Sequence, residues 1–548
     1  MDTCSPVLVL PVVLLCACSS EAPGAGVAEP PDGGPVHDAG PPDSPDSSPP
    51  DAAPPQPIAD PIETSAGLIT GRVEDGLHVY LGVPYAAPPV GPLRWKDPAP
   101  HEPWRGVLDA TELGPACPQL ESAWGSPPAA QDEDCLTINV WTPASTTADA
   151  LPVLVWIHGG SFVVGSSGLP TYDGANLARR GVVVVSLNYR LGPLGFLAHP
   201  LLATESPHAS SGNYGVLDQI EALRWVQQNI GRFGGDPARV SVFGHSAGGA
   251  SVCALVASPR AAGLLDRALM QSGFCTGKVE TTADFEPVGL EMETALGCDV
   301  ADDPLACMRA KPPGEVLSAV APGTGLEPGV KYAVLVDGYV LPDSVGHLLA
   351  DGKQQHVPFT AGTSADEGSR YAASLAIQTV AAFHQLIQDR WPAHAAELDA
   401  LYPVSANADV PAALGELLGD WLYVCPARRS ARAMAALGVS THLYQFRYVP
   451  HDGETSGLGS YHGAELPYVF GNLIGDADHV YGPEDEKLSA AMMDYWTRFA
   501  TTGDPDGTPS SWPAYEAASD ANIFLDVPTA AGAHLHETGC NAWDGISE

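Results

Sequence analysis

Basic residues are scarce in this chain. Its 548 residues include only 25 Lys and Arg against 65 Asp and Glu, and the formal net charge is −40. Proteins that bind nucleic acid use clustered cations to neutralise phosphates, and a strongly negative surface repels the same phosphates at long range. We therefore expect no nucleic-acid partner. Hydrophobic residues make up 45% of the chain, which is enough to bury a large core and predicts a soluble globular protein.

The N-terminal apolar stretch is too short to cross a bilayer as a helix. It lies within "MDTCSPVLVLPVVLLCACSS" and ends in small residues, which is typical of an export signal, although no Lys or Arg precedes it. The sequence "LCAC", which ends at Cys18, resembles a bacterial lipobox, in which Cys18 would receive a lipid. We predict a signal over residues 1–18 and a lipoprotein of the bacterial cell envelope. A plainly cleaved signal and a secreted protein are the alternative.

Large apolar side chains are almost missing from residues 19–61. This stretch consists mainly of Pro, Ala, Asp, Ser and Gly, with eight acidic residues and no Lys or Arg. Such a composition cannot form a packed core, so we predict a disordered linker that could tether the protein to a membrane through a lipidated N-terminus. Residues 62–548 contain no second linker or repeat and are expected to form one domain.

No pair of cysteines has the C-x-x-C spacing of a structural zinc site, so we expect no metal. Eight cysteines follow the signal, and an even number in an exported protein favours disulfides. The short loops between them predict two disulfides, Cys117 with Cys135 and Cys298 with Cys307. A third pair, Cys253 with Cys275, is a weaker prediction.

Strand and helix patterns alternate along residues 62–548. The runs "LPVLVWIHGG" (151–160) and "GVVVVSLNYR" (181–190) are rich in β-branched residues and end in or begin with glycine, as in strands buried on both faces of a sheet. Residues 218–234 have helical periodicity and end in glycine. Residues 67–86 alternate around "EDG" and predict a small antiparallel ribbon. Together these patterns predict an α/β fold whose central sheet is mainly parallel.

A candidate nucleophile lies in "RVSVFGHSAGGASVCALVASP". Ser246 occupies the centre of a G-x-S-x-G motif, with a strand pattern before it and a helix pattern after it. Flanking glycines allow the tight turn that exposes the serine oxygen. A bare five-residue match occurs often by chance, but a match between a strand and a helix favours a catalytic serine.

A serine nucleophile needs a histidine to take its proton and a carboxylate to orient the histidine. In this fold class the chain order is Ser, Asp or Glu, then His. "SADEG" supplies Asp366 and Glu367, and "YHGAELPYVFG" supplies His462. Spacing alone does not decide between Asp366 and Glu367, or between His462 and other histidines such as His451.

The reaction also needs N–H donors for the oxyanion. Ala247, directly after the serine, is one candidate, and the loop in "VWIHGGSF" with Gly159 and Gly160 is the other. A glycine pair after a strand is also a common loop terminator.

In combination, these motifs resemble those of the type-B carboxylesterase and cholinesterase family over nearly all of residues 62–548. The matching segments occur in the family's order. They are "EDCLTINVW", "WIHGGSF", "NYRLGPLGFL", "GNYGVLDQIEALRWVQQNIGRFGGDPARVSVFGHSAGG", "VDGYVLP", "ADEG", "YHGAELPYVFG" and "WTRFATTGDPDG". The resemblance implies an α/β-hydrolase fold, with a large, mostly parallel mixed sheet flanked by helices and a small N-terminal antiparallel ribbon.

The resemblance also implies roles for individual residues. Ser246 corresponds to the nucleophile, Glu367 to the acid and His462 to the base. The oxyanion hole would be formed by Gly160, Ser161 and Ala247. The resemblance repeats the pairs Cys117–Cys135 and Cys298–Cys307, adds Cys425–Cys540, and makes Arg94 and Glu133 a buried structural ion pair.

Three positions depart from the family pattern. Ser161 stands where the family usually has a third glycine, and its Cβ could shift the oxyanion loop. His245 replaces a carboxylate beside the nucleophile, which makes choline esters less favourable substrates; a role in packing alone is the alternative. Trp124, in the short loop between Cys117 and Cys135, is a weak candidate for an aromatic platform.

We therefore predict a serine carboxylic-ester hydrolase that forms an acyl-enzyme, needs no cofactor and acts on short to medium acyl or aryl esters. Residues 325–335, where relatives shape the acyl pocket, lack a pair of phenylalanines, which favours a tolerant pocket. The alternatives are a lipase, an amidase or carbamate hydrolase, and a non-catalytic binding or adhesion module. The sequence does not assign an oligomeric state.

Overall fold

The computed structural model describes residues 56–57, 61–121, 128–277, 280–321, 331–475, 480–507 and 511–546. The predicted signal, Cys18, most of the predicted linker, Trp124 and the start of the 325–335 stretch lie outside these ranges. Residues 55–548 form one compact unit. In the described part of the chain, no helix is both long enough and apolar enough to cross a membrane.

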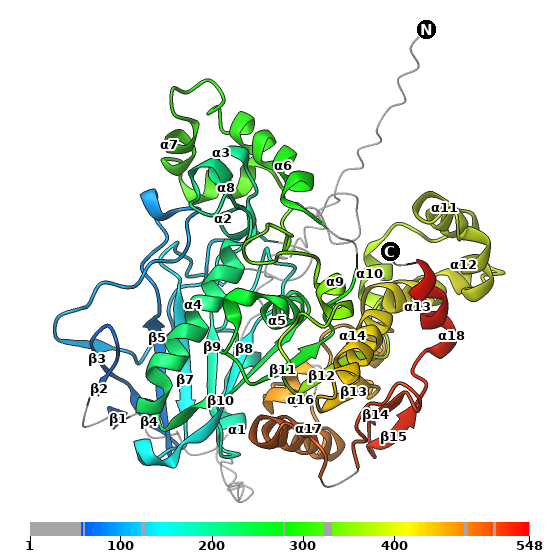
Figure 1. The fold of residues 1–548 in the computed structure, drawn as a ribbon. Coiled ribbons are helices and arrows are strands. Elements are labelled where there is room, and N and C mark those ends of the chain that lie inside the picture. The colour runs from blue at the N-terminus through cyan, green and yellow to red at the C-terminus, as the bar shows by residue number, and fades with distance from the viewer. Residues whose placement is uncertain are drawn as a thin grey trace, which may run out of the picture. The chain divides into compact units, whose positions relative to one another are not determined.

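Two sheets contain the described strands. The large one has twelve strands in the order β1-β4-β5-β7-β9-β8-β10-β11-β12-β13-β14-β15, and the small one has the order β2-β3-β6 (Figure 1). The strands are β1 Gln56–Pro57, β2 Ile62–Glu63, β3 Leu68–Thr70, β4 Arg72–Glu74, β5 Leu77–Pro84, β6 Val107–Asp109, β7 Thr137–Thr142, β8 Leu151–Ile157, β9 Val183–Leu187, β10 Gly235–His245, β11 Arg267–Gln271, β12 Phe359–Ser364, β13 Thr441–Phe446, β14 Ala521–Leu525 and β15 Ala530–Ala533.

Parallel pairing runs without interruption from β9 through β8, β10, β11, β12 and β13 to β14, while the pairs at both edges are antiparallel. The predicted α/β-hydrolase fold with a large, mostly parallel mixed sheet is therefore confirmed. The ribbon predicted from residues 67–86 is divided between two sheets. β4 and β5 pair antiparallel at the edge of the large sheet, whereas β3 pairs with β2 and β6 in the small one.

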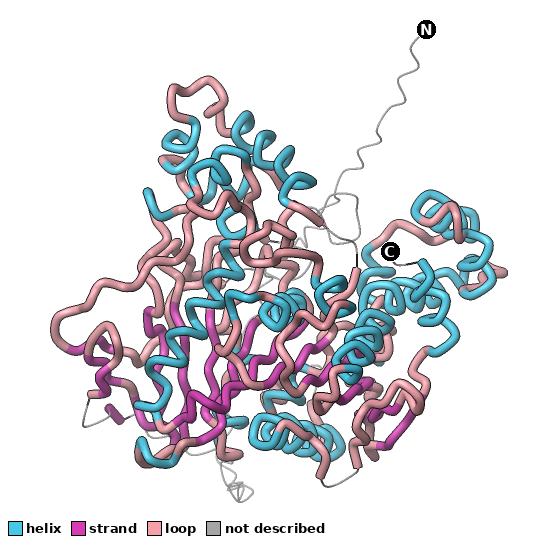
Figure 2. Tube along the Cα trace, viewed as in Figure 1, coloured by secondary structure: helices cyan, strands magenta, loops and turns pink. Residues whose placement is uncertain are grey.

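Helices cover both faces of the large sheet (Figures 1 and 2). They are α1 Ala175–Ala178, α2 Gly192–Phe196, α3 Pro200–Glu205, α4 Tyr214–Asn229, α5 Ala247–Ala257, α6 Thr282–Ala295, α7 Pro304–Arg309, α8 Pro313–Ala319, α9 Val345–Ala350, α10 Ser369–Ser374, α11 Val380–Arg390, α12 Ala395–Leu401, α13 Val410–Gly419, α14 Cys425–Ala436, α15 His451–Ser456, α16 Leu466–Phe470, α17 Pro483–Thr502 and α18 Glu537–Ile546.

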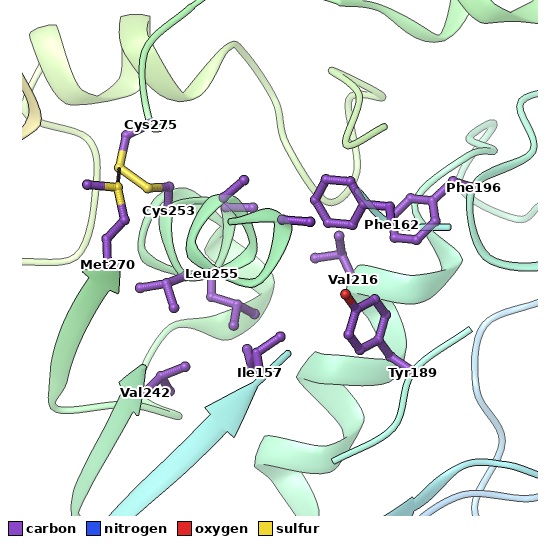
Figure 3. Packing of buried hydrophobic residues seen from close by; sticks show 14 of the residues in the cluster. Ile157, Phe162, Tyr189, Phe196, Val216, Val242, Cys253, Leu255, Met270 and Cys275 are labelled. Carbon is purple, nitrogen blue, oxygen red and sulfur yellow. Dashed lines mark hydrogen bonds between the residues drawn. A yellow bond between two sulfur atoms is a disulfide. The ribbon is translucent and has the colours of Figure 1, made fainter. Parts of the chain in front are cut away.

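Strand β8 shows how the sheet separates two cores. Successive side chains of a strand point to opposite faces. Accordingly, Val155 and Ile157 pack in the core that contains α4 and α5, whereas Leu154 and Trp156 pack in the core that contains α17. Figure 3 shows Ile157 on the α5 side, close to Leu255. The continuous apolar run in the sequence follows from burial on both faces.

The helix predicted over residues 218–234 has different bounds in the structure. Helix α4 begins four residues earlier, at Tyr214, and ends at Asn229. A single 3₁₀ turn, Ile230–Phe233, follows it, and Gly234 then takes a left-handed conformation with φ of 77°. The last predicted turn thus tightens into a 3₁₀ geometry, as is common at helix ends, and glycine ends it without steric cost.

Four disulfides are formed in the described part of the chain. They are Cys117–Cys135, Cys253–Cys275, Cys298–Cys307 and Cys425–Cys540. The weaker prediction, Cys253 with Cys275, is thus also confirmed as a disulfide, which joins α5 to the segment after β11 (Figure 3). Several disulfides in one chain are typical of proteins outside the cytoplasm.

Arg94 and Glu133 form a buried ion pair, as the resemblance implies. The guanidinium donates from Nε at 2.8 Å and from Nη2 at 2.5 Å to the two carboxylate oxygens. It also donates to the main-chain carbonyl of Lys311. This pair therefore joins three segments of the fold.

Candidate active site

Ser246 lies at the sharp turn between β10 and α5. Its backbone has φ of 58° and ψ of −122°, a conformation that costs an L-residue about 1 to 3 kcal/mol. The turn closes because glycines replace side chains at the contacts. A Cβ on Gly244 would lie 2.5 Å from the carbonyl oxygen of Gly248, and a Cβ on Gly248 would lie 2.1 Å from the carbonyl oxygen of Ile157. The strain and the close approach are the geometry of a nucleophile elbow.

His462 and Glu367 meet near the carboxyl end of the sheet. Glu367 lies in the turn after β12, and its Oε1 accepts the backbone N–H of Ser364 at 2.7 Å. Its Oε2 lies 2.6 Å from Nδ1 of His462. Glu367 is 1% exposed and His462 is 5% exposed, so water competes little for this contact. The carboxylate that contacts the imidazole is thus Glu367 rather than Asp366.

Asp366 and His451, the alternatives left open by spacing, lie elsewhere. Asp366 accepts the backbone N–H of Ser460 at 2.8 Å, and its own N–H donates to the carbonyl of Ser460 at 2.9 Å. These bonds join the Glu367 turn to the segment that leads into His462. Asp366 therefore positions the two loops. His451 is an exposed residue at the start of α15.

Burial sets the protonation of the pair. It raises the pKa of Glu367 to about 8, while the hydrogen bond from the backbone N–H of Ser364 lowers that pKa. Burial also lowers the pKa of His462, and the positive charge of Arg370 lowers it further. Both effects on His462 favour the neutral imidazole, which is the form that can accept a proton. Its Nε2 has no hydrogen-bond partner among the described residues.

Tyr423 lies against both Ser246 and His462. It belongs to a π-helical turn, Asp420–Val424, and such turns often occur at functional sites. Its ring centroid is 4.6 Å from that of His462, and its hydroxyl is hydrogen-bonded to the hydroxyl of Tyr371. Burial raises the pKa of Tyr423 well above 10, whereas a hydrogen bond with the Ser246 side chain lowers it. Neither tyrosine was predicted from the sequence, because only the fold brings residue 423 to the elbow.

His245 is buried beside the catalytic candidates. Its ring lies 4.5 Å from the ring of His462, and its Nε2 lies 3.7 Å from Oε1 of Glu465. Burial lowers the pKa of His245 well below its usual 6.5, and the charges of His462 and Arg370 lower it further. His245 is therefore a neutral imidazole, unlike the carboxylate that the family pattern has at this position.

Glu465 is a second buried carboxyl group, and no pattern in the sequence predicted it. It accepts from Nε2 of Gln271 at 3.4 Å and from Oγ of Ser364 at 3.3 Å. Burial and the negative charge of Glu367 raise its pKa to about 8. Two neighbouring carboxyl groups resist ionising together. We expect Glu367, with the closer donors, to hold the charge and Glu465 the proton.

The loop after β8 lies directly against the elbow. A Cβ on Gly159 would lie 2.6 Å from the carbonyl oxygen of His245 and 3.0 Å from Cβ of Ser246. Gly160 and Ser161 both have positive φ, 115° and 54°. Ser161 therefore takes a left-handed conformation that glycine adopts at lower cost. Ala247 is the first residue of α5, where a backbone N–H has no partner within the helix.

Two groups of possible metal ligands occur among the described residues, and both surround Asp420. One includes Cys425 and Cys540, which are joined in a disulfide. In the other, the Asp420 carboxylate already accepts from Tyr402 at 2.8 Å and lies 2.6 Å from Nδ1 of His536. Neither group contains the elbow serine or the His462–Glu367 pair.

The fold and this arrangement together define a serine hydrolase of the α/β-hydrolase class. The family model described as "Carboxylesterase family" matches residues 59–543, so the chain belongs to the carboxylesterase family. It is a carboxylic-ester hydrolase.

Individual relatives agree with this assignment. The chain is 37% identical over 474 residues to a fumonisin B1 esterase of Sphingopyxis macrogoltabida, covering 84% of this chain and 85% of the relative. It is 36% identical over 483 residues to a para-nitrobenzyl esterase of Bacillus subtilis, covering 85% and 94%. A solved PNB esterase structure matches with a TM-score of 0.78 and 33% identity, over 89% of this chain and all of that one.

Proposed function

We propose that Ser246, His462 and Glu367 are the catalytic triad. His462 takes the proton of the Ser246 hydroxyl as the oxygen attacks the ester carbonyl, and Glu367 orients the imidazole and stabilises the imidazolium that forms. His462 then protonates the leaving alcohol, and water hydrolyses the acyl-enzyme by the same steps. The observation that carries the proposal is the buried 2.6 Å contact between Nδ1 of His462 and Oε2 of Glu367.

The same proposal includes an oxyanion hole formed by the backbone N–H groups of Gly160, Ser161 and Ala247. Two features support it: the glycine loop packs on the elbow, and Ala247 begins a helix. N–H groups at a helix N-terminus favour negative charge, and one oxyanion donor typically contributes about 10²- to 10³-fold to kcat.

A fluorophosphonate probe is expected to label the wild-type enzyme at Ser246, and Ser246→Ala is expected to lose both the label and at least about 10⁴-fold in kcat. Mass spectrometry of the labelled peptide measures the site. The matched control is Ser251→Ala, which removes a serine of the same helix that bonds Gln219. Labelling of Ser246→Ala at the wild-type rate would refute the assignment.

Short to medium acyl or aryl esters are the proposed substrates. Support comes from the names of the relatives, which include esterases of p-nitrobenzyl esters and of cocaine, and from the absence of a phenylalanine pair in residues 325–335. On a p-nitrophenyl series we expect kcat/KM for butyrate to exceed that for palmitate about tenfold or more. A lipase would give the reverse order and a rise in rate when the substrate forms micelles.

The four disulfides favour a site of action outside the cytoplasm. The lipid on Cys18 and the linker over residues 19–61 stay predictions from the sequence.

A further inference from the structure

Arg370 is a cation beside the proposed catalytic base. It is the second residue of α10, three positions after Glu367, and it is half-buried. Its Cζ lies 5.5 Å from the ring centroid of Tyr461, the residue that precedes His462. In the described ranges, no carboxylate lies within 4 Å of its guanidinium nitrogens. The more deeply buried Arg94, by contrast, has a carboxylate partner at 2.5 Å.

The acidic groups closest to this region in the fold already have other partners. Asp366 accepts from the backbone of Ser460, and Glu367 accepts from His462 and from the backbone of Ser364. Asp452 accepts the hydroxyl of Tyr461, whose ring lies under the arginine. Although the chain carries a large excess of acids, no carboxylate of the described residues therefore forms an ion pair with Arg370.

The charge of Arg370 works against the proposed reaction when the site is empty. It lowers the pKa of His462 and also that of His245, in both cases after the larger effect of burial. Base catalysis requires His462 to become an imidazolium as Ser246 attacks, and a nearby permanent cation disfavours that state. Among the described groups that touch His462, Glu367 supplies the one negative charge that can stabilise the imidazolium. The others are the rings of His245, Tyr371 and Tyr423.

We propose that Arg370 binds a carboxylate of the substrate, so that the enzyme prefers esters that carry a second, free carboxylate close to the ester bond. A guanidinium suits this role because it is always charged and can donate two parallel hydrogen bonds to a carboxylate. The bound anion would orient the substrate and also offset the cation beside His462. This inference rests on the proposed function, because it assigns a substrate class to the same site.

The net charge of −40 does not exclude an anionic substrate. At physiological ionic strength, charges separated by more than about 8 Å are largely screened, so distant surface acids weaken the encounter only slightly. The local cation then decides which substrate binds.

The test compares anionic esters with neutral esters of similar size. Monomethyl glutarate is paired with methyl valerate to place the carboxylate on the acyl side, and 4-acetoxybenzoate is paired with 4-acetoxybenzamide to place it on the leaving group. Four enzymes are compared: wild type, Arg370→Gln, Arg370→Lys and Arg232→Gln. Arg232 is an exposed arginine paired with Glu63, so its variant controls for net charge.

We expect Arg370→Gln to lower kcat/KM about 10- to 100-fold for the anionic member of at least one pair. The neutral member should be hydrolysed at an equal or higher rate. Arg370→Lys should restore part of the anionic rate, and Arg232→Gln should behave as wild type. With the neutral ester, the acid limb of the kcat/KM profile should move to higher pH in Arg370→Gln, because removal of the cation raises the pKa of His462.

A loss of rate confined to the anionic ester separates recognition from a folding defect, which would slow both esters. If Arg370→Gln slowed both members equally, or neither, the inference would be overturned while ester hydrolysis stood. If the wild type hydrolysed none of the four esters and Ser246 did not react with fluorophosphonate, the proposed function itself would fail.

Discussion

Glu367→Gln is expected to lower kcat about 10⁴-fold with little change in KM. The structure explains why an amide of the same size fails here. Oε1 of Glu367 accepts the backbone N–H of Ser364, so the amide oxygen would keep that position and the amide NH₂ would face Nδ1 of His462. The imidazole would then carry its proton on Nε2, the atom that must accept the proton of Ser246. Steady-state kinetics on p-nitrophenyl butyrate measure the loss.

Glu465→Gln is the matched control for this prediction. Glu465 is also fully buried in the site, but it lies near His245, and its hydrogen-bond donors are more distant than those of Glu367, so we expect Glu465 to hold the proton of the two carboxyl groups. Glutamine mimics a protonated glutamate, so we expect kcat to fall less than about tenfold. Equal losses in the two variants would show that the two carboxyl groups act as one unit, and the separate role proposed for Glu367 would be wrong.

Loss of the Cys425–Cys540 disulfide is expected to cause the largest loss of stability among the four bridges. This bond closes a loop of 115 residues and joins α14 to the C-terminal helix α18. In the chain-entropy model, such a loop contributes about 5 kcal/mol to the free energy of unfolding. Urea denaturation of the double variant Cys425→Ala/Cys540→Ala under non-reducing conditions measures the change.

The control is the double variant Cys298→Ala/Cys307→Ala, whose bridge spans nine residues. The same model gives about 3 kcal/mol for this shorter loop. A larger loss for the short bridge than for the long one would contradict an entropic origin. Because Tyr423 lies two residues before Cys425, we also expect the long-bridge variant to have altered esterase kinetics.

Local sequence patterns were sufficient to predict much of the fold of this protein. The strand, G-x-S-x-G turn and helix around Ser246 are contiguous, so the sequence predicted the elbow and the α/β class correctly. Residues far apart were harder to place. Spacing left Asp366 and Glu367 open, and the family resemblance favoured Glu367, which is the residue that contacts His462 in the structure.

By itself, then, the sequence determined the α/β-hydrolase fold, the elbow around Ser246 and the family. The tertiary structure alone decided which groups surround His462. Tyr423 reaches it from a π-helical turn, Glu465 is buried next to His245, and Arg370 lies over Tyr461 without a carboxylate partner in the described part of the chain. The reason is physical: contacts within an element follow from short-range periodicity, whereas contacts between the ends of different strands depend on how the whole sheet is assembled.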